Sequence, residues 1–405
     1  MLVLVINAGS SSLKYQLLDT DNEEVLAKGL CERIGIAEPR IKHQPAAKEA
    51  YSAVVEMPDH KAAVRHVLDC LTDANHGVIK SLDEIEAVGH RVVHGGERFA
   101  QSALISDSVK EAIKDCYPLA MLHNPANMTG ILALEEALPE VPQVAVFDTA
   151  FHQTMPEEAY MYAIPYEYYK KYAIRRYGFH GTSHKFVAER AAELLERPLS
   201  QTNIITCHLG NGSSITAVKG GKSIDTSMGL TPLAGVPMGT RSGDIDPAIV
   251  SMLMEDEKLS VEEINNLLNK ESGMLGISGV SSDFRDLAEA ANEGNQQAQL
   301  ALDMFAYSVK RYIGAYTAVM GSVHAIVFTA GVGENDSETR ENICKGLQRL
   351  GVIIDKSLND GLRGKEAVIS SPESKVKVLV IPTNEELAIA RDTAELARSS
   401  GKVVK

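Results

Sequence analysis

The stretch Val5-Ile6-Asn7-Ala8-Gly9-Ser10-Ser11-Ser12 joins a short apolar run to a turn of glycine and serine. The same device returns at Cys207-His208-Leu209-Gly210-Asn211-Gly212-Ser213-Ser214. Aligned on Gly-Ser-Ser, the two copies lie 203 residues apart (212 minus 9). Glycine lets backbone amides and hydroxyls approach an anion closely, so each turn is a candidate phosphate site. One such turn alone is usually an ordinary hairpin. The matched pair predicts a duplicated fold that holds polyphosphate from both halves.

The composition is that of a globular protein with an acidic surface. The chain has 405 residues, of which 44% are hydrophobic and 23% are charged, and this length is sufficient for two domains. The formal net charge is −14. Nucleic acids and anionic membranes select basic surfaces, so we expect neither as a partner.

Cysteine usage and the amino terminus indicate a soluble, cytoplasmic protein. The five cysteines are odd in number and scattered, with no Cys-x-x-Cys pair, so neither a disulfide framework nor a structural zinc site is expected. No basic region precedes the first apolar residues. No apolar run approaches the roughly 20 residues of a membrane helix.

Segments typical of strands and of helices are mixed along the chain, which favours an α/β class. The expected strands are 2–6, 14–18, 85–92, 143–147, 203–209, 325–329 and 376–382. The expected helices and helix-rich stretches are 60–71, 109–117, 126–137, 183–195, 244–270 and 288–321. We place one domain at 1–150 and the second at 151–384, with a last helix, 385–405, returning to the first. Thr383 and Glu386 match a capping box at its start.

A third glycine segment, Ala330-Gly331-Val332-Gly333-Glu334-Asn335, follows the apolar strand 325–329. Glycines in a loop after a strand allow a nucleotide to approach the backbone, although Gly-x-Gly alone is weak evidence. No GxxxxGK[ST] motif occurs in the chain, which excludes a P-loop NTPase.

Several charged residues lie at strand ends or in glycine-rich loops, as in the clefts of α/β proteins. Arg91 lies near the end of one expected strand, Asp148 directly follows another, and Arg241 lies between glycines. Each has a structural alternative, namely an ion pair for the arginines and a helix cap for Asp148. A buried, hydrogen-bonded role is the alternative for the histidines His180, His184 and His208.

Taken together, these segments resemble the acetate kinase family. The resemblance rests on VINAGSSSLKY (5–15), RRYGFHGTSH (175–184), HLGNGSS (208–214), GTRSGD (239–244), GVGEN (331–335) and TNEEL (383–387). The motifs span essentially the whole chain in the expected order, and only stretches such as 36–58 carry none. The resemblance implies the duplicated actin-like (ribonuclease H-like) two-domain fold of the sugar kinase, heat-shock chaperone and actin superfamily. It also implies ATP bound in the interdomain cleft and a homodimer.

The activity implied by the resemblance is reversible transfer of a phosphoryl group from ATP to acetate, giving acetyl phosphate and ADP by direct in-line transfer. The acetate carboxylate is already ionised at neutral pH, so the site must supply positioning and charge neutralisation rather than a base. The resemblance assigns Arg91 to the acetate carboxylate. It assigns the transferring phosphoryl group to His180, Arg241 and Asn211.

The resemblance also implies a Mg²⁺ site, with Mn²⁺ as a substitute, at Asn7 and Glu385. Mg²⁺ keeps several of its waters, so we expect these side chains to act partly through water, and Glu385 also suits a helix N-terminus. The family marks Asp148 as catalytic, yet acetate has no proton to lose. We therefore expect Asp148 to orient Arg91 or a metal-bound water.

Nucleotide and substrate contacts complete the expected site. The resemblance implies ATP contacts from Ser10, Ser12, Lys14, His208, Leu209, Gly210, Asn211, Gly212, Asp283, Phe284, Arg285, Gly331, Val332, Gly333, Glu334 and Asn335. Around the acetate methyl group it places Val93, Leu122, Phe179 and Pro232. Because Val93 leaves little room, we expect acetate to be preferred over propionate, by about 1–3 kcal/mol for one methylene.

Three alternatives remain from the residues themselves. The nearest is a kinase for propionate or another short-chain acid. A sugar kinase of the same superfamily could use Asp148 as a base, but Arg91 and Arg241 do not suit a neutral sugar. An actin-like or chaperone-like ATPase is the third, and a chaperone would carry a further peptide-binding domain that we do not expect after the last motif.

Overall fold

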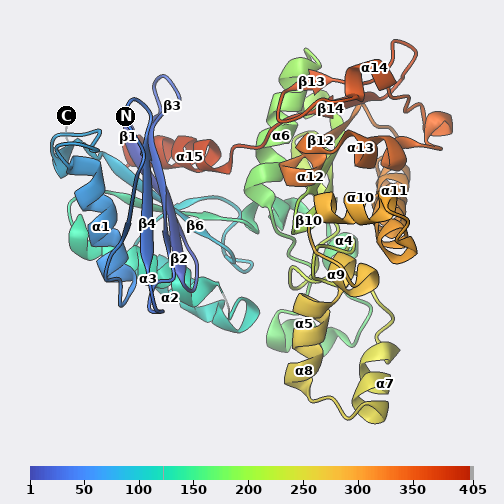
Figure 1. Cartoon of the computed structure of the whole chain (residues 1–405), viewed down its shortest axis with the longest axis horizontal. Coiled ribbons are helices and arrows are strands. Elements are labelled where there is room, and N and C mark those ends of the chain that lie inside the picture. Colours follow the sequence, from blue (N-terminus) through green and yellow to red (C-terminus); the bar gives the residue numbers. More distant parts are fainter. Residues whose placement is uncertain (122, 402–405) are drawn as a thin grey trace. The chain divides into compact units, whose positions relative to one another are not determined.

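The structure is a computed structural model that describes residues 1–121 and 123–401. The chain divides into two compact units, Met1–Gln153 with Asn384–Lys405, and Thr154–Thr383. Each unit contains one mixed β-sheet flanked by helices (Figure 1). The predicted α/β class is therefore confirmed.

The first unit contains an eight-stranded sheet of order β5-β4-β3-β2-β1-β6-β8-β7. Strands β1, β6 and β8 are mutually parallel, and every other neighbouring pair is antiparallel. The bounds are β1 Leu2–Ala8, β2 Ser12–Asp19, β3 Glu24–Glu32, β4 Arg40–Pro45, β5 Tyr51–Val54, β6 Ala87–Val92, β7 Ala103–Leu104 and β8 Gln143–Phe147.

Helices cover both faces of this sheet, which explains why its parallel strands are apolar and buried. The helices are α1 His60–Thr72, α2 Asp107–Asp115, α3 Asn124–Ala137 and α15 Glu385–Ser399. Helices α1 and α3 share a core with β1 residues such as Leu4 and Ile6. Helix α15 packs closely at Gly89 of β6, where an added Cβ would lie 2.4 Å from Oγ1 of Thr393. The last helix thus belongs to the first unit, and it ends at Ser399.

The second unit contains a six-stranded sheet of order β11-β10-β9-β12-β14-β13. Its strands are β9 Asn203–Leu209, β10 Ser213–Lys219, β11 Lys222–Thr226, β12 Ala325–Thr329, β13 Ala367–Val368 and β14 Lys377–Val380. Its helices are α4 Glu157–Tyr160, α5 Tyr166–Tyr172, α6 Gly181–Leu194, α7 Ala248–Asp256, α8 Val261–Asn266, α9 Gly273–Ser278, α10 Phe284–Asn292, α11 Gln296–Met320, α12 Ala330–Asn335, α13 Ser337–Cys344 and α14 Lys356–Asn359. One core joins β9, β10 and β12 to the buried face of α11.

The two sheets repeat one topology. Strands β3-β2-β1-β6-β8-β7 of the first and β11-β10-β9-β12-β14-β13 of the second follow each other in the same order. The pairings also match, with two parallel pairs at the centre of each set and antiparallel pairs outside. The predicted duplication is therefore confirmed.

The repeated turns correspond in a different register from the one the sequence suggested. Strand β1 ends at Ala8 and β9 ends at Leu209, so Gly9 corresponds to Gly210, an offset of 201 (210 minus 9). In each turn this glycine donates its N–H to the carbonyl at the end of the turn, Ser12 at 2.8 Å and Gly212 at 3.2 Å. The second turn is one residue shorter. The predicted alignment on Gly-Ser-Ser is therefore wrong, because Ser10 and Ser11 lie in the first turn whereas Ser213 and Ser214 belong to β10.

Two local expectations also differ. Residues Ala330–Asn335 form a short helix, α12, instead of a loop. Helix α15 is capped by Asn384, whose Oδ1 accepts the N–H of Leu387 at 3.0 Å, and not by Thr383. The Oγ1 of Thr383 is hydrogen-bonded to Oγ of Ser183 instead.

His90 on β6 is a buried titratable group next to Arg91. Its side chain is 2% exposed, and its Nε2 lies 2.7 Å from Oε1 of Gln143. Burial lowers the pKa of His90 to about 4, from an ordinary value of 6.5. His90 is therefore neutral in the folded protein, and protonation favours unfolding.

We expect His90 to make the first unit acid-labile. The pKa of His90 is lower in the folded than in the unfolded chain. Its contribution to the free energy of unfolding is therefore complete above about pH 6.5 and is lost as the pH falls toward 4, with about 2 kcal/mol lost by pH 5. Thermal unfolding of His90→Gln and of the native chain at about pH 7.5 and 5 tests this. The variant should lose less stability on acidification. His66→Gln on α1 is the control, and equal losses in all three proteins would contradict the assignment.

Candidate active site

In the first unit, Arg91 and Asp148 form a forked ion pair at the ends of two parallel strands. The Nε of Arg91 donates to Oδ1 of Asp148 at 3.1 Å and its Nη2 to Oδ2 at 2.5 Å. The Asp148 side chain is 2% exposed, while that of Arg91 is 24% exposed. The Nη1 of Arg91 lies 3.5 Å from Oδ1 of Asn7. The carboxylate thus fixes the guanidinium through Nε and Nη2, while Nη1 faces Asn7.

Burial and charge shape the titration of this group. Burial raises the pKa of Asp148, and the charge of Arg91 acts against that rise. For Arg91, burial alone would lower the pKa, but the charges of Asp148 and Glu385 outweigh it and raise it. Burial raises the pKa of Glu385 to about 7, with Arg91 opposing and Asp148 adding to the shift. Asp148, Glu385 and Arg91 are therefore within electrostatic reach of one another.

The turn between β1 and β2 is fixed from a helix. The Nε2 of His60, the first residue of α1, lies 2.7 Å from the carbonyl of Gly9. Lys14 lies opposite Asn7 in the strand register, so the two side chains share one face of the hairpin. Ser10 is exposed and Ser12 is half-buried at the ends of the turn.

Asn127 on α3, which no sequence motif indicated, joins the end of β1 to the residue that follows β6. Its Oδ1 accepts the N–H of Val93 at 3.1 Å, and its Nδ2 donates to the carbonyl of Ala8 at 2.7 Å. Val93 is 5% exposed. Leu122, expected beside Val93, lies outside the described residues.

In the second unit, His180 stands at the start of α6 in a left-handed conformation, with φ of 57°. Its ring is stacked on that of His208 at a centroid distance of 4.0 Å. Its Nδ1 lies 2.9 Å from Oγ of Ser214. A strained backbone in a non-glycine residue is often found at functional sites.

A buried polar chain extends behind His180. The Oγ of Ser214 also lies 2.7 Å from Nε2 of His184, whose Nδ1 lies 2.7 Å from Oγ1 of Thr206. His184, Ser214 and Thr206 are all fully buried. Along Thr206, His184, Ser214 and His180, each hydrogen bond can therefore polarise the next, as far as the imidazole ring of His180.

Arg241 converges with His180 on the second turn. A Cβ added at Gly212 would lie 3.5 Å from Nη1 of Arg241 and 3.5 Å from Nε2 of His180. The Nη1 of Arg241 donates to the carbonyl of Pro232 at 3.1 Å. Among the described residues no carboxylate forms an ion pair with this guanidinium, and burial lowers its pKa. The guanidinium of Arg241 and the imidazole of His180 thus both face the turn.

A cavity of about 830 Å³ in the second unit adjoins this turn. Of the predicted nucleotide residues, it is lined by Gly210, Asn211, Asp283, Phe284, Arg285, Gly331, Val332 and Asn335. Further lining residues that the sequence did not indicate are Ser282, Ala288, Asp336, Ser337, Glu338 and Arg363. Arg363 lies near two glycines of positive φ, Gly361 and Gly364, which is the signal that could have identified it.

Two other predicted nucleotide residues, Leu209 and Glu334, do not line this cavity but lie next to residues that do. Leu209 is fully buried in the core. The Oε1 of Glu334 accepts the N–H of Ala330 at 2.7 Å and that of Thr383 at 3.0 Å. Its carboxylate therefore joins the end of β12 to the segment that follows β14.

Arg340 is a fully buried cation beneath α12. It donates to the carbonyl of Gly333 at 2.9 Å, to Oδ1 of Asn359 at 2.9 Å and to the carbonyl of Leu362 at 3.0 Å. All of these acceptors are neutral, and burial lowers the pKa of Arg340. Arg340 holds the glycine segment against the chain that carries Arg363.

The predicted residues thus fall into two groups. The first unit holds Asn7, Ser10, Ser12, Lys14, Arg91, Val93, Asp148 and Glu385. The second unit holds Phe179, His180, His208, Asn211, Pro232, Arg241 and the residues of the nucleotide cavity. Among the described residues we find no cluster of three or more His, Cys, Asp or Glu side chains that could bind a metal ion.

Comparison with known proteins gives full-length matches. Residues 2–391 match the Acetokinase family. The chain is 62% identical over 396 residues to an acetate kinase of Alkaliphilus metalliredigens, covering 98% of this chain and 100% of that protein. The crystal structure of an acetate kinase of Porphyromonas gingivalis has a TM-score of 0.95 at 51% identity, covering 98% and 99% of the chains. A propionate kinase of Francisella tularensis gives a TM-score of 0.91 at 45% identity, with the same coverage.

The matched family, the order of motifs and the fold agree over nearly the whole length of the sequence. The chain belongs to the acetokinase family.

Proposed function

We propose that this chain transfers the γ-phosphoryl group of ATP directly and in line to acetate, giving acetyl phosphate and ADP reversibly. Acetate kinase activity follows from the family and its full-length relatives, and the propionate alternative is not favoured. The observation that best supports the proposed roles is the convergence of Arg241 and His180 on Gly212, beside the nucleotide cavity. An unpaired guanidinium at that position suits a phosphoryl group in transfer.

In this proposal the acetate carboxylate attacks without a general base, because it is already ionised. Arg91 binds the carboxylate, and its fork to Asp148 fixes the direction from which acetate approaches. Asp148 acts through Arg91 and takes no proton. Val93, Leu122, Phe179 and Pro232 would enclose the methyl group.

His180 would donate a hydrogen bond to the transferring group. The Oγ1 of Thr206 lies 2.7 Å from Nδ1 of His184 and 3.5 Å from the carbonyl of Thr216, and we assign its one proton to the shorter contact. Nε2 of His184 then donates to Ser214, and Ser214 donates to Nδ1 of His180. The proton of His180 then resides on Nε2, the atom that faces Gly212 and Arg241. His180 would stabilise charge together with Arg241 and Asn211.

The family requires a divalent metal, and we propose Mg²⁺ held by Asn7 and Glu385. The first unit offers an amide oxygen and carboxylates near Arg91, a hard oxygen set with few protein ligands that suits Mg²⁺ bound mainly to phosphates and water. Bound Mg²⁺ would neutralise phosphate charge. Asn7 and Glu385 would orient its waters.

We also propose a homodimer located in the cytoplasm. Exposed apolar side chains on α5 of the second unit, Tyr166, Tyr168 and Tyr172, support a partner surface. All five cysteines are free and buried, which suits a reducing compartment. None of the described helices is both long and apolar enough to cross a bilayer.

The reaction and its pocket are tested together by trapping acyl phosphate with hydroxylamine. With ATP and Mg²⁺, product should be greatest with acetate, lower with propionate and least with butyrate. Val93→Ala should raise the ratio of kcat/KM for propionate to that for acetate about tenfold, because it removes the crowding of one methylene. Val92→Ala, which truncates the last residue of β6, is the control. An unchanged ratio would refute the pocket, and no acyl phosphate from any acid would refute the reaction.

Asp148→Asn tests whether Asp148 orients Arg91. The amide preserves the shape of the side chain but removes the charge that holds the guanidinium. We expect kcat/KM for acetate to fall about a hundredfold, with Mg²⁺ affinity changed less. Steady-state kinetics at saturating Mg²⁺, alongside thermal unfolding as a check of folding, measures this. Near-native turnover would overturn the assigned role.

Ser214→Ala tests the polar chain behind His180. The substitution removes the hydrogen bonds of Ser214 to both His180 and His184. Loss of the bond to His180, worth about 1 kcal/mol, should lower kcat about fivefold and leave KM for acetate nearly unchanged. The pH profile of kcat should also shift, because His180 loses the group that fixes its tautomer. Thr216→Val, which removes another buried hydroxyl of β10, is the matched control. Equal effects of both substitutions would indicate a merely structural role.

A further inference from the structure

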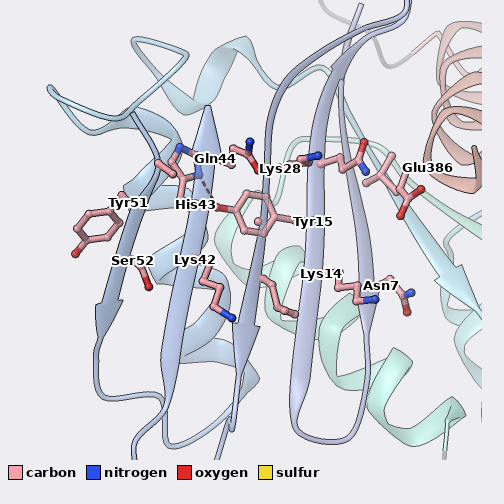
Figure 2. Close-up of a pocket in the computed structure, with 15 residues that line it drawn as sticks. Asn7, Lys14, Tyr15, Lys28, Lys42, His43, Gln44, Tyr51, Ser52 and Glu386 are labelled. Carbon is pink, nitrogen blue, oxygen red and sulfur yellow. Dashed lines mark hydrogen bonds between the residues drawn. The ribbon is translucent and has the colours of Figure 1, made fainter. Parts of the chain in front are cut away.

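The outer strands of the first sheet carry a cavity that none of the proposed roles explains. It encloses about 500 Å³ and is lined only by residues of the first unit. Its side-chain lining includes Lys14 and Gln16 of β2, Lys28 and Leu30 of β3, and Lys42 and Gln44 of β4. We call these six residues the lysine face. Figure 2 shows the three lysines on neighbouring strands, with Asn7 beside Lys14.

The strand register places the three lysines at the corners of a triangle. Lys14 of β2 and Lys42 of β4 are both paired with Leu30 of β3, and Lys28 lies two residues from Leu30 on the same strand, diagonal to both. Diagonal neighbours on one sheet face are about 7–8 Å apart, and a lysine side chain can swing by several ångströms. Three ammonium groups can therefore reach one small molecule lying across β2, β3 and β4.

The charge on this face is poorly compensated. Lys42 forms an ion pair with Glu32 at 2.7 Å. Among the described residues, neither Lys14 nor Lys28 has a carboxylate within ion-pair distance, although the chain has 54 acidic residues and 40 basic ones. Like charges on adjacent strands repel and destabilise a sheet. A multivalent anion would remove that repulsion.

The rest of the lining suits an organic anion. Gln16, Gln44 and Ser52 offer neutral polar groups, and Val5, Leu30 and Ala50 supply apolar surface. The volume is in the range of small-molecule sites. Glu386 of α15 lines the cavity on the same side as Asn7. Because its carboxylate repels anions, an anion is favoured over β2–β4 and disfavoured near α15.

We propose that the lysine face binds a small organic polyanion carrying two or three anionic groups, carboxylates or phosphates. Lys28 and Lys42 anchor it, and Lys14 completes the site at the inner end. The regulatory part of this inference rests on the proposed function. Lys14 is also a proposed phosphate contact opposite Asn7, so an occupant that engages Lys14 lowers turnover, and added acetate does not reverse the effect.

Calorimetric titration of the whole protein with tricarballylate, a tricarboxylate, tests binding in the absence of ATP and metal. A parallel titration with pyrophosphate shows whether the site prefers phosphate groups to carboxylates. Saturating acetate keeps the carboxylates away from Arg91. The variant is Lys28→Gln with Lys42→Gln, which leaves the proposed catalytic residues intact. The matched control is Lys219→Gln with Lys222→Gln, two exposed lysines paired across β10 and β11.

We expect at least one probe to bind the native chain and the control equally, and to bind the Lys28/Lys42 variant about tenfold or more weakly. No binding of either probe to the native chain overturns the proposal. Equal weakening by both double substitutions also overturns it, because the attraction would then come from overall charge.

A second measurement separates this site from the proposed function. Acetyl phosphate formation by the native chain should fall as the bound probe is added, at every acetate concentration, while the Lys28/Lys42 variant keeps its activity and resists inhibition. Equal inhibition of native and variant proteins overturns the regulatory role. If no acetyl phosphate forms at all, the proposed function fails while the titration still decides whether the site exists.

Discussion

Parallel pairing of three neighbouring strands in each sheet is the constraint on which the candidate site depends. Parallel strands end at the same edge, and functional groups of α/β proteins gather there. In the first sheet the pairing of β1 with β6 and of β6 with β8 aligns the positions that lead to Asn7, Arg91 and Asp148. In the second, β9, β12 and β14 bring together the ends that lead to Gly210, α12 and Thr383.

The two units use this common edge differently. The first places an ion pair there, so that one guanidinium is held by a buried carboxylate. The second places a neutral polar chain there, in which serine and threonine hydroxyls orient imidazoles. The same scaffold therefore occurs twice, and in the function proposed above its side chains bind the carboxylate in the first unit and the phosphoryl group in the second.

The sequence predicted best where a single physical signal dominates. Strands β9 and β12 have the expected bounds because each is an apolar run with a clear end. Gly210 follows β9, and β12 ends at Thr329. Strands β3 to β5 were missed because one of their faces is polar, with Lys28, Lys42 and Gln44 interrupting the pattern. Asn127, Ser214 and Arg340 were missed because their importance comes from hydrogen bonds to residues distant in the chain. The resemblance to a known family indicated site residues that hydrophobic periodicity does not distinguish. The N-cap at Asn384 became evident only from the backbone conformation at the start of α15.

Arg340 shows how little the charge of a whole chain says about the field inside it. In a protein with a formal charge of −14, this guanidinium is fully buried, and the acceptors of its hydrogen bonds among the described residues are neutral oxygens, one of them the carbonyl of Gly333 in the glycine segment of the nucleotide cavity. A charge removed from water is weakly screened, and its potential extends further than that of an exposed lysine. The lining of the cavity also carries Asp283, Asp336 and Glu338. Arg340 therefore offsets part of their negative charge from within the protein, where salt in the solvent can do little to weaken its effect.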